Sequence, residues 1–224
     1  MASGADRFGT HRVMVPRGSL PQQAQKLSPA LPIHGNEMLI EVEALNIDSA
    51  SFHQIRESCG GDVGLMEHMI RDIVKERGKL QNPVTGSGGM LIGTVKEVGS
   101  EFLVERPASE QVEVGDRIAT LVSLTLTPLV IRRVKKIHLD KDRVDIEGHA
   151  ILFQSGIYSK LPSDIPDALA LAILDVAGAP AQTQALCKPG ETLVVLGGAG
   201  KTGILWLYEA KRAVGAGGRV IGLD

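Results

Sequence analysis

The 224-residue sequence is poor in aromatic residues and has no strong excess of charge of either sign. Aromatic side chains make up 3%, which disfavours the stacking platforms of proteins that bind single-stranded nucleic acid. Because 24 Lys and Arg face 26 Asp and Glu, there is also no basic excess for binding a phosphate backbone. We therefore expect no nucleic-acid partner.

Cysteine and long hydrophobic runs are also scarce. Cys59 and Cys187 are too few for a disulfide framework or a cysteine-rich zinc site, which favours a reducing compartment. The longest apolar run covers residues 168–174, far short of the ~20 residues that span a bilayer. Residues 1–9 lack the apolar core of a signal peptide. The sequence predicts a cytoplasmic protein with no membrane partner.

Short strand-like segments dominate the first 160 residues. They are rich in β-branched residues, are separated by turn residues, and cover 38–45, 91–98, 117–121 and 129–137. This spacing predicts a mainly β, barrel-like domain. Residues 46–52 are predicted to be a polar loop or short turn.

One helix is predicted inside this β-rich part, over residues 62–77. Asp62 has a residue type preferred as an N-cap, apolar pairs then recur every four residues, and Gly78 follows a basic last turn. Such an apolar stripe, methionines included, predicts a helix face packed on a core. The helix also looks like an insertion in the barrel, where it could cover a cleft.

The composition changes near residue 160. Residues 162–186 are rich in Ala and Leu and predict two helices, interrupted near Gly178 and Pro180. We therefore divide the chain into domains at 1–160 and 161–224.

The second domain contains a βαβ pattern. Residues 192–196 form a continuous apolar strand of the kind that is buried on both faces. A glycine loop, a helix over 204–214 and a strand over 219–223 follow.

The glycine loop carries the motif G-x-G-x-x-G at Gly198, Gly200 and Gly203, directly between the strand and the helix. In this pattern the glycines allow the tight turn, the approach of a pyrophosphate and close packing of helix on strand. The free N–H groups where the helix begins, around Thr202, would receive the phosphates. The alternative is a glycine-rich turn without a ligand.

Asp224 ends the second strand, 21 residues after Gly203. A carboxylate there accepts hydrogen bonds from the ribose hydroxyls and repels a 2′-phosphate, which favours NAD over NADP. Lys201 is either a contact to a cofactor phosphate or a solvated lysine. A triphosphate-binding P-loop is excluded because Val195 stands where that motif requires glycine.

The order of these elements resembles the medium-chain dehydrogenase/reductase superfamily. Residues 37–42 look like its first barrel strand, 93–99 with 114–117 resemble its glycine-valine signatures, and 188–196 resemble its approach to the cofactor loop. The resemblance implies an α/β protein: a β-rich GroES-like barrel catalytic domain, then the start of a Rossmann dinucleotide-binding domain. Since a complete Rossmann domain needs about six strands, we expect a truncated one, the front portion of a longer enzyme that is homo-oligomeric at full length.

A narrower resemblance rests on longer strings. FGTHRV, LNIDSASF, QNPVTGSGGMLIGT and GGAGKTG are similar to the L-erythro-3,5-diaminohexanoate dehydrogenase family, and they cover 8–13, 45–52, 81–94 and 197–203. The resemblance implies a diamino acid substrate and its NAD-dependent oxidative deamination to 5-amino-3-oxohexanoate and ammonium, a step of lysine fermentation. Two alternatives stay open: a zinc-independent quinone or enone oxidoreductase of the same superfamily, and a catalytically inactive fragment.

The superfamily's catalytic zinc has no counterpart in this sequence. Its G-H-E is replaced by Gly86-Ser87-Gly88, and the loop after the first strand has no cysteine. The six histidines form no pair at metal-ligand spacing, so we expect no metal. His11, His53 and Cys59 are interpreted as packed or solvated.

The resemblance places the loop after the first strand at the substrate cleft. We assign catalytic roles to Asp48, as a proton acceptor or an anchor for an ammonium group, and to Ser51. Ser49, Ser87 and Gly88 are assigned to substrate binding. The alternative is local: Asp48 caps a turn and the serines make turn hydrogen bonds.

Overall fold

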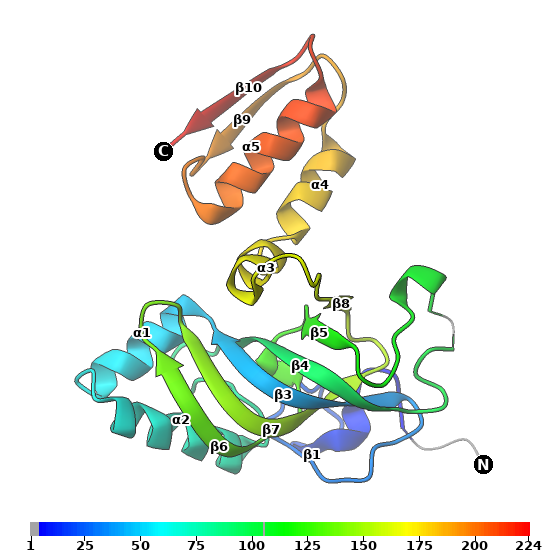
Figure 1. Cartoon of the computed structure of the whole chain (residues 1–224), viewed down its shortest axis with the longest axis vertical. Helices are drawn as coiled ribbons and strands as arrows, with labels where there is room; N and C mark the ends of the chain where they lie inside the picture. Colours follow the sequence, from blue (N-terminus) through cyan, green and yellow to red (C-terminus); the bar gives the residue numbers. More distant parts are fainter. Residues whose placement is uncertain (1–4, 105) are drawn as a thin grey trace. The chain divides into compact units, whose positions relative to one another are not determined.

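The computed structural model describes residues 5–104 and 106–224, and the side chains of Ser109 and Lys201 are not described. The chain divides into two compact units, Met1–Leu161 and Pro162–Asp224. Helices and strands carry the labels of Figure 1.

A six-stranded antiparallel sheet forms the centre of the first unit (Figure 1). Its order is β6 (Leu129–His138), β7 (Arg143–Phe153), β3 (Glu37–Ile47), β4 (Gly89–Val98), β5 (Arg117–Thr120) and β8 (Tyr158–Lys160). The four strands expected from the sequence are confirmed, each within two residues at its ends. The closure of this sheet into a GroES-like barrel stays a prediction.

Strand β7 was missed by the sequence analysis, although it lies between β6 and β3. Its exposed side contains charged residues, whereas Val144 and Ile146 alternate with them and are fully buried. Gly148 allows the close approach of β6, because a Cβ there would lie 2.0 Å from the carbonyl oxygen of Val130.

The remaining short elements of the first unit lie outside this sheet. Strands β1 (Val13–Val15) and β2 (Lys26–Leu27) pair with each other, and three 3-10 turns cover Thr10–Arg12, Ala108–Glu110 and Leu124–Leu126.

Helix α1 (Ser49–Ser58) corrects the expected loop over residues 46–52. It begins directly after β3 and buries Phe52 and Ile55 in the core. Asp48 stands at the N-cap position, but its side chain makes no capping hydrogen bond, so its expected alternative role as a turn cap is not what the structure shows.

Helix α2 (Val63–Arg77) forms where the sequence predicts it, and both of its ends are as expected. The side chain of Asp62 accepts a hydrogen bond from Leu65 N at 2.9 Å, and Gly78 ends the helix in the left-handed conformation, with φ 64°. The predicted apolar stripe is confirmed as core for Met66, Ile70, Ile73 and Val74, which are buried. Leu65, which was predicted in the same stripe, is 56% exposed.

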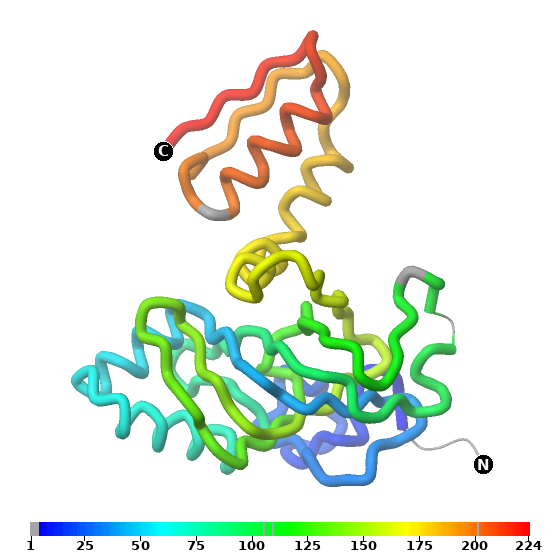
Figure 2. Tube along the Cα trace, in the orientation of Figure 1, coloured from blue at the N-terminus to red at the C-terminus, as the bar shows by residue number. Residues whose placement is uncertain are grey.

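The second unit holds α3 (Asp167–Leu174) and α4 (Gly178–Leu186), followed by β9 (Thr192–Leu196), α5 (Lys201–Val214) and β10 (Arg219–Leu223). Figure 2 traces the last three as one strand–helix–strand path. Strands β9 and β10 are parallel, as a βαβ unit requires. Helix α5 begins three residues earlier than expected.

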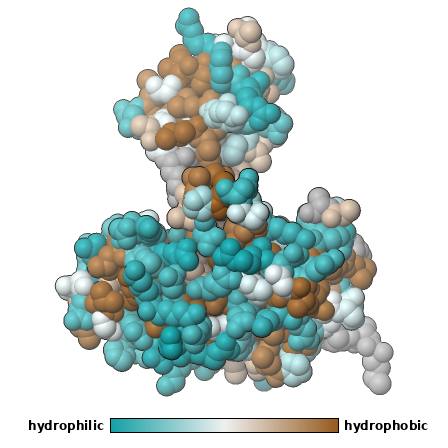
Figure 3. Space-filling model, in the orientation of Figure 1, coloured by the Kyte–Doolittle hydropathy of each residue, from teal (hydrophilic) through white to brown (hydrophobic). Residues whose placement is uncertain are grey.

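The expectation that β9 is buried on both faces is wrong for the described residues. Val195 is buried, but Val194 and Leu196 are 49% and 73% exposed. Figure 3 shows hydrophobic residues gathered on the surface of this unit. Among the described residues β9 pairs only with β10, which leaves these side chains of β9 uncovered, and Ile221 and Leu223 of β10 are also exposed.

Within the described part of the chain, we find no helix long and apolar enough to cross a bilayer.

Candidate substrate and cofactor sites

Three hydroxyl groups meet where α1 begins. Ser51 Oγ lies 2.6 Å from Thr85 Oγ1 and 2.6 Å from Ser87 Oγ, and Ser51 itself is 1% exposed. Thr85 Oγ1 and Ser87 Oγ are 3.3 Å apart. The structure thus brings Ser51 and Ser87 together and adds Thr85, which the sequence analysis did not single out. These three residues are called the hydroxyl cluster below.

Asp48 lies beside this cluster and is tied to the same loop. Its carboxylate oxygen Oδ2 accepts a hydrogen bond from Gly88 N at 3.1 Å, and Asp48 N donates to Gly88 O at 3.2 Å. Both contacts join the end of β3 to the segment that carries Ser87. Four of the five residues assigned to the substrate site are therefore neighbours.

Ser49 is the exception. It is exposed, and its Oγ donates to Asp142 Oδ2 at 2.6 Å, a residue of the turn between β6 and β7. Since its described side-chain hydrogen bond leads away from the cluster, the assignment of Ser49 to substrate binding has no structural support.

The loop over residues 82–88 is held by a buried asparagine that the sequence analysis missed. Asn82 Oδ1 accepts from Val84 N at 2.8 Å, and Asn82 Nδ2 donates to Gln54 Oε1 of α1 at 2.8 Å. Glycine is required next to this loop, because a Cβ on Gly89, whose φ is 119°, would lie 2.0 Å from Asn46 O. These contacts place the loop that carries Thr85 and Ser87 between α1 and β4.

This arrangement combines one carboxylate with three neutral hydroxyls. A hydroxyl donates one hydrogen bond and accepts others, so the cluster can bind a carboxylate or a water molecule. The half-buried carboxylate of Asp48 can accept a proton or hold an ammonium group. Both capacities suit an amino acid substrate.

The glycine loop of the second unit is folded against the end of β10. Gly197 N and Gly198 N both donate to Leu223 O at 2.8 Å. The left-handed residue of the turn is Gly197, with φ 78°, which directly precedes the motif. A Cβ on Gly203 would lie 2.0 Å from Gly197 O, so this glycine allows the close packing that the motif predicts.

The carboxyl end of β10 brings Asp224 to this loop. Ala199 N donates to Asp224 Oδ1 at 3.4 Å. Gly200 precedes α5 with no side-chain cap, and a Cβ added to it would meet nothing closer than Gly197 O at 3.5 Å. An open glycine, an uncapped helix start and an adjacent carboxylate fit a dinucleotide. Thr202 is half-buried in the first turn, and the side chain of Lys201 lies outside the described part.

Comparison with known proteins agrees with the narrower sequence resemblance. A family model described as the N-terminal domain of L-erythro-3,5-diaminohexanoate dehydrogenase matches residues 11–162. This chain belongs to the L-erythro-3,5-diaminohexanoate dehydrogenase family. Asp48 and the hydroxyl cluster all lie within the matched residues.

Two curated relatives carry the name L-erythro-3,5-diaminohexanoate dehydrogenase. The protein of Acetoanaerobium sticklandii is 57% identical and that of Fusobacterium nucleatum 56% identical, each over 217 residues and 97% of this chain. The chain spans 62% of the length of each relative.

Solved structures give more distant likenesses. A quinone oxidoreductase of Coxiella burnetii is 20% identical, with a TM-score of 0.46, over 90% of this chain and 52% of that one. A mycobacterial quinone oxidoreductase is 22% identical, with a TM-score of 0.45, over 89% and 47%. At this level of similarity the two solved structures give no information about the activity of this chain.

A group of three side chains with metal-ligating atoms lies elsewhere in the first unit of this chain. Among the described residues, His11, His34 and Glu37 place ligand atoms within 4.8 Å of one another, which sequence spacing did not indicate. However, Arg12 donates to both oxygens of Glu37, at 2.8 and 2.5 Å. A cation would compete with this guanidinium for the same carboxylate, so we assign the group a structural role.

Proposed function

We propose that this protein, at the length of its relatives, catalyses the NAD-dependent oxidative deamination of L-erythro-3,5-diaminohexanoate. The products are 5-amino-3-oxohexanoate and ammonium, and the reaction belongs to lysine fermentation. The observation that carries the proposal is the meeting of Asp48 with the hydroxyl cluster inside the domain that the family model matches.

In this proposal the first unit binds and orients the diamino acid. Asp48 holds an ammonium group or accepts a proton from the reacting amine or water. Ser51 and Ser87 bind the carboxylate or the water, with Thr85 fixing their orientation. The N–H of Gly88 keeps the Asp48 carboxylate in place.

The second unit binds the cofactor. NAD, when bound, accepts a hydride from C3 of the substrate, the carbon whose amine is replaced by the oxo group. The backbone at Gly198, Gly200 and Gly203, with Thr202 and Lys201, holds the pyrophosphate where α5 begins. Asp224 accepts hydrogen bonds from the ribose.

The direct test is the initial rate of NADH formation with L-erythro-3,5-diaminohexanoate. It should be measured on the 224-residue chain and on a form extended to the full length of the relatives. We expect a rate from the extended form. No rate from that form would overturn the proposal, and NADPH-dependent quinone reduction in its place would support the alternative oxidoreductase.

Replacing Asp224 by Asn is expected to weaken NAD binding by the extended form about tenfold or more. The physical reason is the loss of charge-assisted hydrogen bonds to the ribose, each contributing about 1.5–3 kcal/mol. Binding is measured by titration with NADH and NADPH, and the preference for NADH should shrink. Asp164→Asn is the matched control, because it removes the same charge from an exposed residue outside the loop. Equal affinities for NADH in wild type and Asp224→Asn would contradict the assignment.

Replacing Ser51 by Ala is expected to lower kcat/KM for the diamino acid about tenfold. The change removes the hydroxyl that contacts both Thr85 and Ser87, and such a neutral hydrogen bond contributes about 1 kcal/mol. Ser49→Ala is the matched control, because it deletes the same atom two residues away, where the hydroxyl contacts Asp142. The site assignment fails if the two variants have the same kcat/KM.

A further inference from the structure

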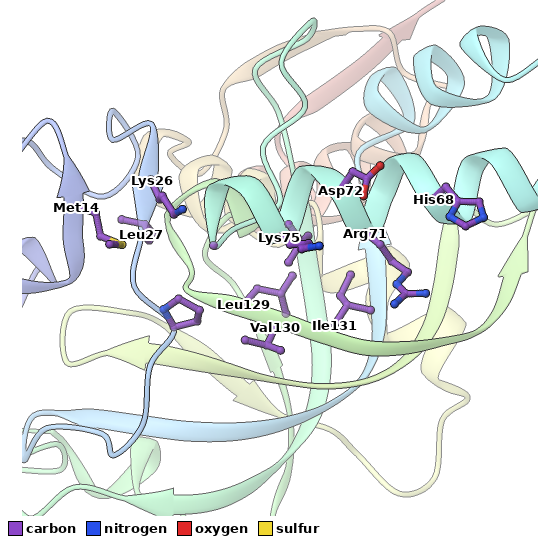
Figure 4. Close-up of a pocket in the computed structure, with 13 residues that line it drawn as sticks. Met14, Lys26, Leu27, His68, Arg71, Asp72, Lys75, Leu129, Val130 and Ile131 are labelled. Atoms are coloured by element: carbon purple, nitrogen blue, oxygen red, sulfur yellow. The ribbon is translucent and has the colours of Figure 1, made fainter.

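A pocket of about 500 Å³ lies between α2, β6 and the paired strands β1 and β2 (Figure 4). Its lining includes neither Asp48 nor the hydroxyl cluster, so the pocket is separate from the candidate substrate site. Its volume falls within the ~300–1,000 Å³ of small-molecule sites. Helix α2, whose apolar side packs on the core, forms one wall of this pocket with residues such as His68, Arg71 and Lys75.

The floor of this pocket is apolar. Val130 and Ile131 of β6 are only half-buried, and Figure 4 shows them below α2. Leu27 and Leu129, which are fully buried, continue the same surface. Such a floor favours an aliphatic group, because covering it removes apolar area from water.

The rim of the pocket is positively charged. Lys26, Arg71 and Lys75 line it, against the single acid Asp72. Figure 4 shows the guanidinium of Arg71 directed toward β6 and the carboxylate of Asp72 directed to the opposite side of the helix.

These cations are largely uncompensated. The amino groups of Lys26 and Lys75 have no hydrogen-bond or ion-pair partner among the described residues. Arg71 has one loose ion pair, to Glu67 at 3.5 Å, in which both side chains are at least a third exposed. Three cations around an apolar floor, in a chain of net charge -2, favour an anionic ligand.

We propose that this pocket binds a small aliphatic carboxylate, with its chain on β6 and its carboxylate between Arg71, Lys75 and Lys26. The guanidinium fork matches the two oxygens of a carboxylate. A phosphate ester is disfavoured because its second charge costs more to remove from water beside an apolar floor. The diamino acid is also disfavoured, since its ammonium groups would face three cations. The site therefore goes beyond the proposed function and does not depend on it.

Hexanoate is a suitable probe, titrated into the 224-residue chain while the methyl signals of Val130 and Ile131 are followed by NMR. We expect saturable shifts with a dissociation constant on the order of 1 mM, as for a ligand of this size. Hexan-1-ol and hexylamine, of the same chain length, should bind more than about tenfold more weakly. Absence of shifts with hexanoate, or equal binding of hexan-1-ol, would overturn the proposal.

Two variants locate the carboxylate. Lys75→Gln should weaken hexanoate binding about fivefold, because one exposed charge interaction is lost. Lys141→Gln, in the turn between β6 and β7 and outside the pocket lining, makes the same change of charge and should leave binding unchanged. Since both lysines lie near the surface, the methyl spectra should show a folded protein in each case. Equal effects of the two variants would mean that hexanoate binds through net charge alone and would contradict the assigned site.

Discussion

Replacing Glu37 by Gln is expected to lower the free energy of unfolding of the first unit by about 3–5 kcal/mol. Glu37 is fully buried at the start of β3. Its carboxylate accepts two hydrogen bonds from Arg12 and one from His34 N at 2.8 Å, and His11 Nε2 lies 2.7 Å from it. The amide would leave Arg12, which is 4% exposed, as a buried charge without its anion.

Urea denaturation followed by circular dichroism measures this loss. Glu41→Gln is the matched control on the same strand, where the carboxylate is 45% exposed and pairs with Lys96 at 2.9 Å. An exposed pair of this kind contributes at most about 1 kcal/mol. If both variants lose the same stability, the buried network contributes nothing beyond a surface ion pair.

The pH dependence of stability provides an independent check on Glu37. Burial alone would raise its pKa, but the hydrogen bonds from Arg12 and His11 outweigh burial and lower the pKa from 4.5 to about 2. Because the pKa is lower in the folded state, this stabilisation is fully present above about pH 4.5 and is lost as the pH falls through about 2. The difference corresponds to about 3 kcal/mol. In Glu37→Gln the acid-induced loss of stability should be smaller by that amount.

The elements that the sequence predicted well are those whose signals are local. Asp62 and Gly78 terminate α2 through contacts within one turn of the helix. The βαβ unit follows from an apolar strand and a glycine motif that are adjacent in the chain. In each case the residues that determine the element lie within a few positions of it.

The sheet depends on pairing between distant residues, and there the prediction was incomplete. Strand β7 pairs with β3 across about a hundred positions, with Leu152 opposite Met38. Lys79 is another example: it is fully buried, and its Nζ donates to the carbonyls of Pro21 and Gln22. Burial lowers the pKa of Lys79 to about 8. Neither the burial nor the lowered pKa can be predicted from the position of this lysine in the sequence.

The candidate substrate site shows the same division. Asp48, Ser49 and Ser51 were assigned to the site from one stretch of sequence. Because this stretch was expected to be a loop, the sequence offered no reason to assign the two serines different contacts. Because α1 is helical, residues two apart point to nearly opposite sides, at about 200°. Ser51 therefore contacts Thr85 within the hydroxyl cluster, whereas Ser49 contacts Asp142. Thr85 was missed because its contact with Ser51 joins residues 34 positions apart.

Replacing Gly203 by Ala is expected to reduce the NAD affinity of the extended form about 100-fold. The added Cβ would lie 2.0 Å from Gly197 O and 2.8 Å from Gly198 Cα, so only a shift of α5 away from the loop could accommodate it. The overpacking lowers stability by about 1–3 kcal/mol. The shift of α5 also moves the N–H groups at its start away from the pyrophosphate, and a 100-fold loss of affinity corresponds to about 3 kcal/mol of lost binding free energy. Titration with NADH measures it.

Substitutions at two other glycines distinguish an effect on packing from an effect on contact with the cofactor. Gly217→Ala is the control, because a Cβ there meets nothing within 4 Å and its φ is not left-handed, so binding should be unchanged. Gly200→Ala fits the fold, with Gly197 O at 3.5 Å, but it narrows the space in front of α5 that a pyrophosphate would enter. We therefore expect Gly200→Ala to weaken NADH binding without lowering the thermal stability, whereas Gly203→Ala lowers both. Unchanged NADH binding in Gly200→Ala would show that the cofactor does not approach this loop, since that variant alters the space for a ligand and little else.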